Sequence, residues 1–295
     1  MSLRKSKIKS LAEAVADIPD GAKILAGGVH LSNTPMALVR QLIRKGAKDL
    51  EIIPTPATGL WVDMLIAADA VRKIHVSYIG LEFLGLAPNF RRAAEAGKIE
   101  VVDVDEPTIF HGLRAAASGL PFVVFPPIHL LTDLPKVSPQ VYKSIVDPFT
   151  GKTVVAVPPL QPDVCFVHVA KADIYGNGLS LGGRHMEDII TKASKRVILS
   201  AEEIVDNAEF CAYPTRTTIP GVLVEAVVHA PMGAWPGACP GVYDYDRPHL
   251  LEYNEMAKKN ETSSYLDRFV RPHADDTAMI AALDDEHLSR LRMAR

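Results

Sequence analysis

The stretch from residue 163 to residue 203 constrains the fold of this chain more than any other. An apolar run at residues 164–169 leads into a polar, glycine-rich loop, a short helical segment follows, and residues 196–200 form a second apolar run. This is the pattern of a βαβ unit, whose right-handed crossover makes the two strands parallel. Open parallel sheets bind ligands at the carboxyl ends of their strands. The loop over residues 171–185 is therefore the first candidate position for a site.

The same alternation of apolar and helical segments runs through the chain before this unit. Short apolar runs precede loops and helical segments at residues 22–26, 50–54, 74–79, 99–104 and 122–125. Strands that alternate with helices are typical of a parallel sheet covered on both sides. We therefore predict an α/β fold with an open, mainly parallel sheet and helices on both faces.

No change of composition divides the chain strongly. We expect one α/β domain over residues 1–248 and a C-terminal helical tail over residues 249–295 that packs on the same domain. Residues 126–152 contain five prolines and are predicted to be a long excursion with little regular structure, which is typical of a lid or an interface arm. The aromatic loop at residues 235–245 has no evident cover and is predicted to be a second apolar interface surface.

Composition excludes several classes of protein. The net charge is −3 with both signs interspersed, which gives no electrostatic reason to expect nucleic acid or an anionic membrane as partner. The three cysteines form no CxxC pair, so we expect a reducing compartment and no zinc site. No run approaches the roughly 20 apolar residues of a membrane span. We predict a cytoplasmic protein that holds no metal.

Glycines recur between strand ends and helix starts. Gly27 and Gly28, Gly59, and Gly182 with Gly183 occupy such positions, and we expect the last pair to open a helix. Backbone N–H groups at a helix start suit a phosphate, a carboxylate or a developing oxyanion. Tight turn geometry alone explains the same glycines equally well. Because none matches G-x-G-x-x-G or the P-loop pattern, nucleotide binding by those devices is disfavoured.

Carboxylates also fall at the predicted carboxyl edge. Glu82 follows the third apolar run, Glu106 ends the fourth, and Glu202 follows the run at residues 196–200. A carboxylate at the mouth of a dry pocket can act as nucleophile, general acid or general base. The alternative for each is a helix cap or a surface charge. His111, His129, His168 and His185 have no metal-type spacing, and no G-x-S-x-G elbow of a serine hydrolase is present.

Taken in order, several segments resemble one known family. They are residues 27–50, 89–100, 112–122, 147–169, 179–183 and 220–246. Together they resemble the A (alpha) subunit of family I CoA-transferases, and the nearest type is glutaconate CoA-transferase. The resemblance implies a NagB/RpiA-like α/β fold and a site at the interface with a B (beta) subunit, in an assembly expected to be A2B2.

The resemblance also implies a mechanism. In this family the beta subunit provides a glutamate that attacks the acyl-CoA, a glutamyl-CoA thioester forms, and CoA then passes to an acceptor carboxylic acid. The alpha subunit shapes the acyl pocket and helps to stabilise the thioester oxyanion. By this resemblance Gly27, Gly28, Glu82, Gly182 and Gly183 are substrate-binding residues, and the chain is inactive alone. CoA enters as a substrate, and no organic cofactor is expected.

Two positions depart from the transferase pattern. Glu106 stands where the transferases have a glutamine that donates to the thioester carbonyl, so Glu106 would have to be protonated, which apolar burial favours. Glu82 stands where the glutaconate type has a serine, which argues against glutaconate as the substrate. The pair Asp105 and Glu106 instead matches steroid ring-opening CoA hydrolases, although the tryptophan and twin arginines of that branch are missing. Three functions follow: CoA transfer, C–C bond hydrolysis with Glu106 as the catalytic acid/base, or non-enzymatic ligand binding.

Overall fold

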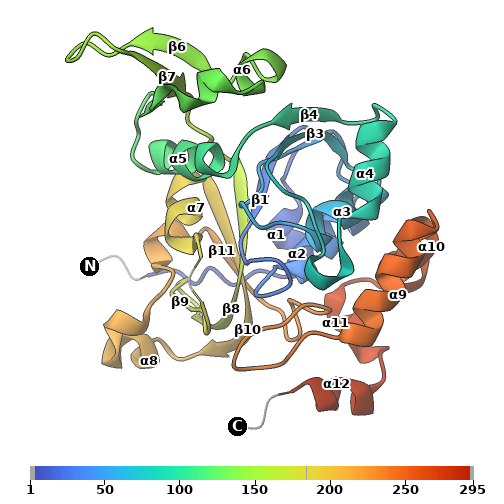
Figure 1. Cartoon of the computed structure of the whole chain (residues 1–295). Helices are drawn as coiled ribbons and strands as arrows, with labels where there is room; N and C mark the ends of the chain where they lie inside the picture. The colour runs from blue at the N-terminus through green and yellow to red at the C-terminus, as the bar shows by residue number, and fades with distance from the viewer. Residues whose placement is uncertain (1–3, 184, 293–295) are drawn as a thin grey trace.

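The computed structural model describes residues 4–183 and 185–292 and is built around one large sheet (Figure 1). Within those residues eight strands run in the order β11-β10-β8-β1-β2-β3-β4, with β9 paired to β8. All pairs along this path are parallel, and only β9 is antiparallel. The strands are β1 (Lys23–Ala26), β2 (Leu50–Ile52), β3 (Val71–Val76), β4 (Glu100–Asp103), β8 (Val164–Asp173), β9 (Gly178–Leu179), β10 (Arg196–Val205) and β11 (Ala226–His229). The predicted fold class is confirmed.

Side chains of the central strands alternate between two cores, as strand geometry requires. Ile24 and Ala26 of β1 pack into one core, while Leu25 packs into the other. The first core is covered by α1 (Leu11–Val15), α2 (Met36–Lys45), α3 (Leu60–Ala67) and α4 (Pro88–Glu95). The second is covered by α5 (Glu106–Ala117) and α7 (Glu187–Ala193). Helices therefore lie on both faces of the sheet.

The proline-rich excursion has more regular structure than its composition predicts. It contains a 3-10 turn η2 (Pro127–Leu131), a short helix α6 (Leu134–Val137) and strand β6 (Lys143–Val146). β6 and β5 (Val123–Phe125) both pair with β7 (Thr153–Val157), so β5 belongs to a separate three-stranded sheet and not to the main sheet as predicted. The prolines flank the strands and leave their N–H groups free to pair.

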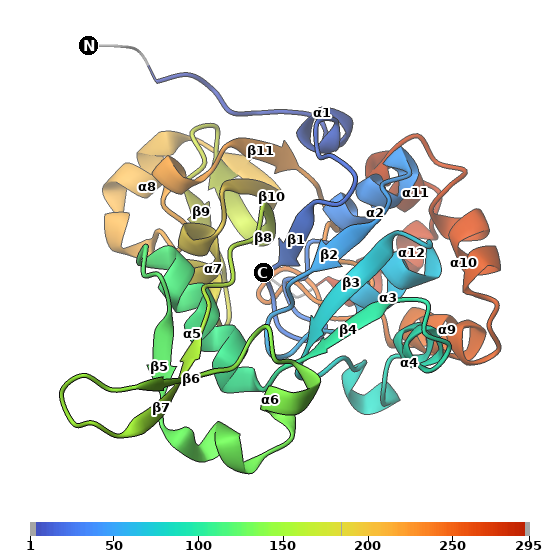
Figure 2. The same cartoon turned by 90° about the horizontal axis from the view of Figure 1, so that it is seen from above.

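This small sheet forms an arm that stands apart from the main sheet (Figures 1 and 2). Large apolar side chains on it are exposed, with Phe149 95% and Leu131 87% accessible. Exposed apolar groups of this number are typical of an interaction surface. The arm thus has the character that its sequence predicts, although its backbone is paired.

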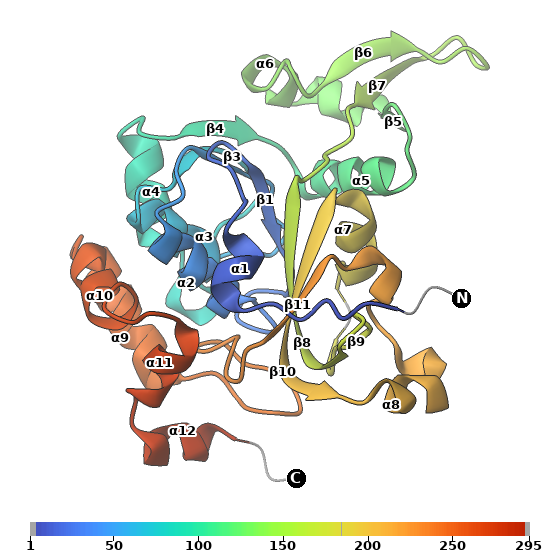
Figure 3. The same ribbon diagram turned by 180° about the vertical axis from the view of Figure 1, so that it is seen from behind.

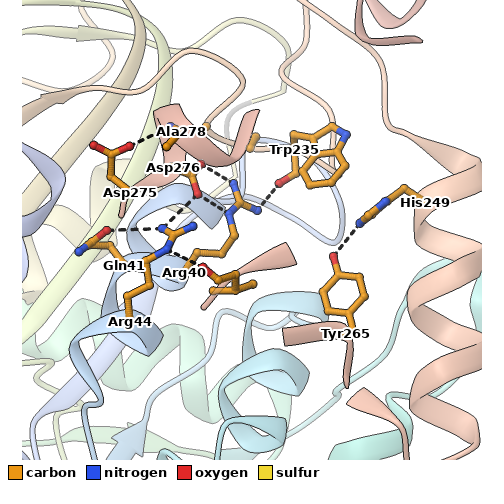
Figure 4. A network of polar contacts seen from close by, with 12 residues as sticks. Arg40, Gln41, Arg44, Trp235, His249, Tyr265, Asp275, Asp276 and Ala278 are labelled. Carbon is orange, nitrogen blue, oxygen red and sulfur yellow. Dashed lines mark hydrogen bonds and ion pairs between the residues drawn. The ribbon is translucent and has the colours of Figure 1, made fainter. Parts of the chain in front are cut away.

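The last four described helices are α9 (Arg247–Lys258), α10 (Thr262–Phe269), α11 (Asp276–Ala281) and α12 (Asp285–Leu291). Of these, α9 packs against α4, α10 against α3 and α11 against α2, while α12 lies beyond α11 (Figure 3). An ion pair holds α11 to α2: the buried guanidinium of Arg40 donates to both oxygens of Asp276, at 2.5 and 2.7 Å (Figure 4). Arg40 also donates to the Trp235 carbonyl oxygen at 2.6 Å. The helical tail is therefore fastened to both the core and the aromatic loop.

The prediction that residues 235–245 form an exposed apolar surface is wrong. Trp235 is 1% accessible, and its ring lies 4.2 Å from the imidazole of His249 in α9. The Trp235 indole donates to Asp246, and Tyr243 is also buried. The C-terminal helices supply the cover that the local sequence does not reveal.

Among the described residues, no helix is both long enough and apolar enough to cross a membrane.

Candidate active site

Four loops meet at the carboxyl edge of the sheet, after β1, β2, β3 and β9. The His30 N–H donates to the Ala57 carbonyl at 2.9 Å and joins the first two loops. Asn33 donates from Nδ2 to the Leu181 carbonyl at 3.3 Å and joins the first loop to the last. The loops after β2 and β3 share a parallel β-bridge. These contacts bring together the loops that carry Gly27, Gly28, Glu82, Gly182 and Gly183.

A buried carboxylate joins the first glycine pair to the loop that carries the last pair. Glu187, the first residue of α7, accepts from the Gly28 N–H at 3.3 Å and from the His185 N–H at 2.9 Å. The Gly27 N–H donates to the Phe166 carbonyl at 2.8 Å. The amides of the first pair are therefore already used inside the chain. Because an internal carboxylate and a strand carbonyl accept from these amides, the turn-geometry alternative is favoured for Gly27 and Gly28.

The glycines are required by close backbone approach. Gly28 has φ +82°, and a Cβ there would lie 2.5 Å from the Ser32 carbonyl oxygen. A Cβ at Gly59 would lie 1.9 Å from the Gly80 carbonyl oxygen. At these two positions the turn-geometry interpretation is sufficient. Gly182 also has a positive φ, +87°, but α7 begins only at Glu187, so this pair lies in the loop and does not open the helix as predicted.

Glu82 lies beside a histidine that the sequence patterns did not single out. The Glu82 Oε1 atom is 3.8 Å from His30 Nδ1, and both side chains are about one-third accessible, at 37% and 33%. The His30 ring meets the Tyr78 ring edge-on, with centroids 6.2 Å apart. His30 and Glu82 both have left-handed backbones, with φ of +50° and +53°. Non-glycine residues rarely adopt this conformation, and they concentrate at functional sites.

Glu106 occupies a different part of the edge. It is the first residue of α5 and is exposed. β4 lies three strands from β1, which puts the ends of these two strands on the order of 14 Å apart along the edge. Glu106 stands instead beside the loop after β3, because Val76 pairs with Asp103. The predicted apolar burial of Glu106 is not present in this chain, and only a partner molecule could provide it.

Asp105 beside it has a structural task. It caps α5 by accepting from the Thr108 N–H at 3.1 Å, and it pairs with His129 Nε2 at 2.8 Å. Partial burial acts to raise the pKa of Asp105, but the hydrogen bonds from Thr108 and His129 outweigh it and hold that pKa below its usual value. His129 belongs to η2, so this carboxylate ties the arm to the main domain.

Glu202 is surrounded by donors. Its Oε1 atom accepts from Tyr243 at 2.7 Å and from the Gly233 N–H at 3.0 Å, and it lies 2.7 Å from His168 Nε2. Its Oε2 atom accepts from the Met232 N–H at 2.7 Å. The carboxylate therefore fixes the loop that follows β11.

Potential ligand atoms of His168, Glu202 and Cys239 lie within 4.8 Å of one another. Their chemistry does not favour a metal. Both Glu202 oxygens are occupied by the donors described above, and His168 Nδ1 is 2.9 Å from the Ser200 hydroxyl. Burial raises the pKa of the Cys239 thiol, which disfavours the thiolate that binds metals. The cluster is best described as a satisfied hydrogen-bond network.

A cavity of about 670 Å³ opens at the carboxyl ends of β8 and β10. Its walls include Leu181 from the Gly182 loop and Tyr243 from the buried aromatic loop. Its Lys171 is paired with Glu209 at 2.9 Å. The cavity touches the glycine loops through Leu181 and so extends the same edge of the sheet.

Three residues of this edge were missed by the sequence reasoning: His30, Tyr78 and Glu187. His30 lies three residues after Gly27, and a search of the glycine loops for titratable residues would have found it. Tyr78 follows the third predicted strand in the same way. The contact between Glu187 and Gly28 spans 159 residues, so no local pattern could have indicated it.

Comparison with known proteins places these features in a family. The A subunit of glutaconate CoA-transferase from Acidaminococcus fermentans is 35% identical over 98% of this chain and 93% of its own length. The crystal structure of that enzyme superposes with a TM-score of 0.90, at 31% identity over 98% of this chain and 96% of that chain. The chain spans 59% of the length of another relative, an uncharacterized protein of Archaeoglobus fulgidus that is 34% identical over 90% of this chain.

Other similar proteins are named for activities other than CoA transfer. The cholesterol ring-cleaving hydrolase IpdA subunit of Rhodococcus jostii is 30% identical over 88% of this chain and 89% of its own length. The structure of a decarboxylase AibA/AibB variant matches 90% of this chain and 98% of that chain, with a TM-score of 0.81 and 32% identity. The family model described as Coenzyme A transferase covers residues 8–230. The resemblance inferred from the sequence is confirmed, and the chain belongs to the Coenzyme A transferase family as an alpha-type subunit.

Proposed function

We propose that this chain is the alpha subunit of a heteromeric CoA-transferase that moves CoA between small carboxylic acids. The observation that carries the proposal is the similarity to the A subunit of glutaconate CoA-transferase, which extends over 98% of the chain. In this proposal an acyl-CoA thioester and a carboxylic acid are the substrates, and a beta subunit supplies the nucleophilic glutamate. The assembly is A2B2, and it holds no metal or organic cofactor.

The open geometry of the edge supports a partner-completed site. Apolar side chains around the loops are exposed, namely those of Tyr78, Phe83, Leu86 and Leu181. Exposed apolar groups that rim polar residues are typical of surfaces that another protein covers. A beta subunit that docks here would exclude water from Glu82 and His30 and would bring its own carboxylate to the pocket.

The test is to co-express the chain with its beta partner and to supply an acyl-CoA and acetate. The proposal expects acetyl-CoA to form, and it expects borohydride treatment after addition of acyl-CoA to trap a glutamyl adduct on the beta partner. The isolated alpha-type chain serves as the control and should form neither product. Turnover without a trapped adduct, or full activity of the isolated chain, would contradict the proposal.

A ring-opening hydrolase is the second candidate. The observation that favours it is the 30% identity to the ring-cleaving hydrolase subunit, together with the Asp105 and Glu106 pair. Glu106 is exposed at the start of α5 and is therefore available to a pocket formed with a partner. The substitution Glu106→Gln separates the two candidates: it should abolish hydrolysis by removing the acid/base, whereas a transferase should tolerate the glutamine because its amide can donate.

A further inference from the structure

We propose that this chain has a second binding site, for an aliphatic carboxylate, toward the amino edge of the sheet. The site is a cavity of about 510 Å³ between α4, the start of α10 and the residues that lead into β3 and β4. Small-molecule sites commonly have this volume. Among the described residues, none that lines the cavity belongs to the loops of the candidate active site. The inference therefore does not depend on the proposed function.

The first argument is the charge of the lining. Arg92 and Lys98 both line the cavity, and neither has a described carboxylate oxygen within 4.0 Å of its side-chain nitrogens. Of the described residues in the lining, Asp69 is the one acid, and its side chain is fully accessible and lies 3.8 Å from Lys48 outside the cavity. The wall therefore carries an excess of positive charge, which attracts an anion.

The second argument is that the Arg92 guanidinium is already held in place. Its Nη2 atom donates to Asn89 Oδ1 and to the Ala257 carbonyl oxygen, both at 2.8 Å. Asn89 is 7% accessible, and its Oδ1 atom also accepts from the Thr262 hydroxyl at 3.0 Å. The Nε and Nη1 atoms of Arg92 have no acceptor among the described residues and are not buried. A donor that is ordered before binding loses little side-chain entropy when an anion arrives.

The third argument is the apolar part of the same lining, which decides the class of anion. The apolar residues in the wall are Ile66, Ala67, Val71, Ala93, Ala96 and Ile99. An aliphatic chain can cover these side chains while its carboxylate meets Arg92 and Lys98, whereas inorganic phosphate would leave them in water. The start of α10 has no side-chain cap, so its first N–H groups add partial charge of the same sign as the two cations.

The experiment titrates the whole chain with hexanoate, with its neutral isostere hexanamide and with inorganic phosphate. Isotope-labelled isoleucine methyl groups report by NMR where each compound binds. With hexanoate, we expect the signals of Ile66 and Ile99 to shift, because both residues line the cavity, and the signal of Ile79, in the loop after β3, to stay in place. Hexanoate should bind at least about tenfold more tightly than hexanamide, which corresponds to about 1.4 kcal/mol, and more tightly than phosphate.

Charge variants test the two cations. Lys98→Glu, at an exposed position, should weaken hexanoate binding at least about tenfold and leave hexanamide binding within about twofold. Arg92→Gln should weaken hexanoate binding in the same direction, and Lys98→Glu decides the matter if that variant does not fold. The matched control is Arg91→Gln, since the neighbouring arginine is 67% accessible and pairs with Glu95, and it should leave the affinity unchanged.

Four results would overturn the inference. They are no detectable binding of hexanoate, equal binding of hexanoate and hexanamide, a shift of the Ile79 signal without shifts of Ile66 and Ile99, and an unchanged affinity in Lys98→Glu.

Discussion

Glu202 near the end of β10 and Glu82 beyond β3 occupy similar places at the carboxyl edge of one sheet, yet their surroundings are opposite. Glu202 is 7% accessible and contacts four donors. Glu82 is 37% accessible, and the His30 Nδ1 atom beside it is 3.8 Å away. From sequence alone, the two were candidates of the same kind.

The difference gives a criterion for choosing which carboxylate to propose for a function. A carboxylate whose oxygens are all occupied by donors of its own chain has no capacity left for a substrate. Glu82 has a left-handed backbone, and the His30 Nδ1 atom beside it has no hydrogen-bond partner among the described residues. Such strained conformations persist only where the surrounding structure or a function imposes them. The covered half of the edge therefore holds the fold together, whereas the Glu82 oxygens in the open half accept no hydrogen bond from the described residues.

The largest expected effect comes from breaking the covered half. Glu202→Ala leaves His168, Tyr243 and two backbone N–H groups without their acceptor, so we expect the free energy of unfolding to fall by about 3 to 5 kcal/mol. The control is Glu203→Ala, the next residue on the same strand, whose side chain is 55% accessible and should cost less than about 0.5 kcal/mol. Urea denaturation of both variants measures the two values. Equal losses would show that the network does not stabilise the fold.

The second prediction concerns the helices that cover this half. Arg40→Met removes the partner of Asp276 and the donor to the Trp235 carbonyl oxygen. We expect a loss of about 3 kcal/mol, at the low end for a broken buried ion pair, because Arg44 remains 3.5 Å from Asp276. The double variant Arg40→Met with Asp276→Leu should recover part of the stability, because the buried Asp276 charge is removed, while Arg44 loses only its 3.5 Å contact and still donates to the Val270 carbonyl oxygen. A double variant less stable than the single one would contradict this account.

The third prediction concerns the pH dependence of stability that arises from His249 in α9, which covers Trp235. Burial lowers the pKa of His249 to about 4, against the opposing attraction of Asp246. His249 takes up its proton near pH 6.5 in the unfolded chain and only near pH 4 in the folded chain, so its contribution to the free energy of unfolding is constant above pH 6.5 and falls as the pH drops through this window. At pH 5 this histidine alone should cost about 2 kcal/mol relative to pH 7.

The measurement is urea denaturation at several pH values between 4 and 7.5. In His249→Gln, whose amide can still meet the Tyr265 hydroxyl, the fall attributed to this residue should disappear. His185→Gln, at an exposed position, should keep the wild-type pH dependence. The same slope in all three proteins would rule out His249 as its origin.

Much of the fold could be predicted because its determinants are local. The apolar runs gave the strands of the parallel sheet, and Gly46 ends α2 with φ +77° and an N–H bonded back to the helix, as a glycine C-cap does. The burial of Trp235 could not be predicted, because its partners Arg40 and His249 come from α2 and α9. The separate sheet of the arm was not predicted, because the high proline content of residues 126–152 indicated irregular structure. The prolines in fact lie outside the strands and do not interrupt them.

The candidate site divides in the same way. Its glycine loops and Glu82 were predicted from their positions after strands, and that reasoning needs only the periodicity of the chain. Which backbone amides remain available depends on Glu187, which reaches Gly28 from a distant helix. His30 has a positive φ angle, and the sequence contains no pattern that predicts a left-handed conformation at a histidine. The features of the site that the sequence did not predict therefore depend on long-range contacts and on backbone conformation.

The smallest expected effect on stability is at the open half, and it sharpens the comparison most. Glu82→Gly removes a side chain from a residue with φ +53°, so we expect the free energy of unfolding to stay the same or to rise by up to about 1 kcal/mol, since relief of strain outweighs the added freedom of the unfolded chain. Asp69→Gly, at a surface residue with φ +56° away from the site, is the matched control and should behave alike. If Glu82→Gly instead lowered stability by more than about 1 kcal/mol, the left-handed glutamate would be a structural element like Glu202, and the distinction between the two halves of the edge would fail.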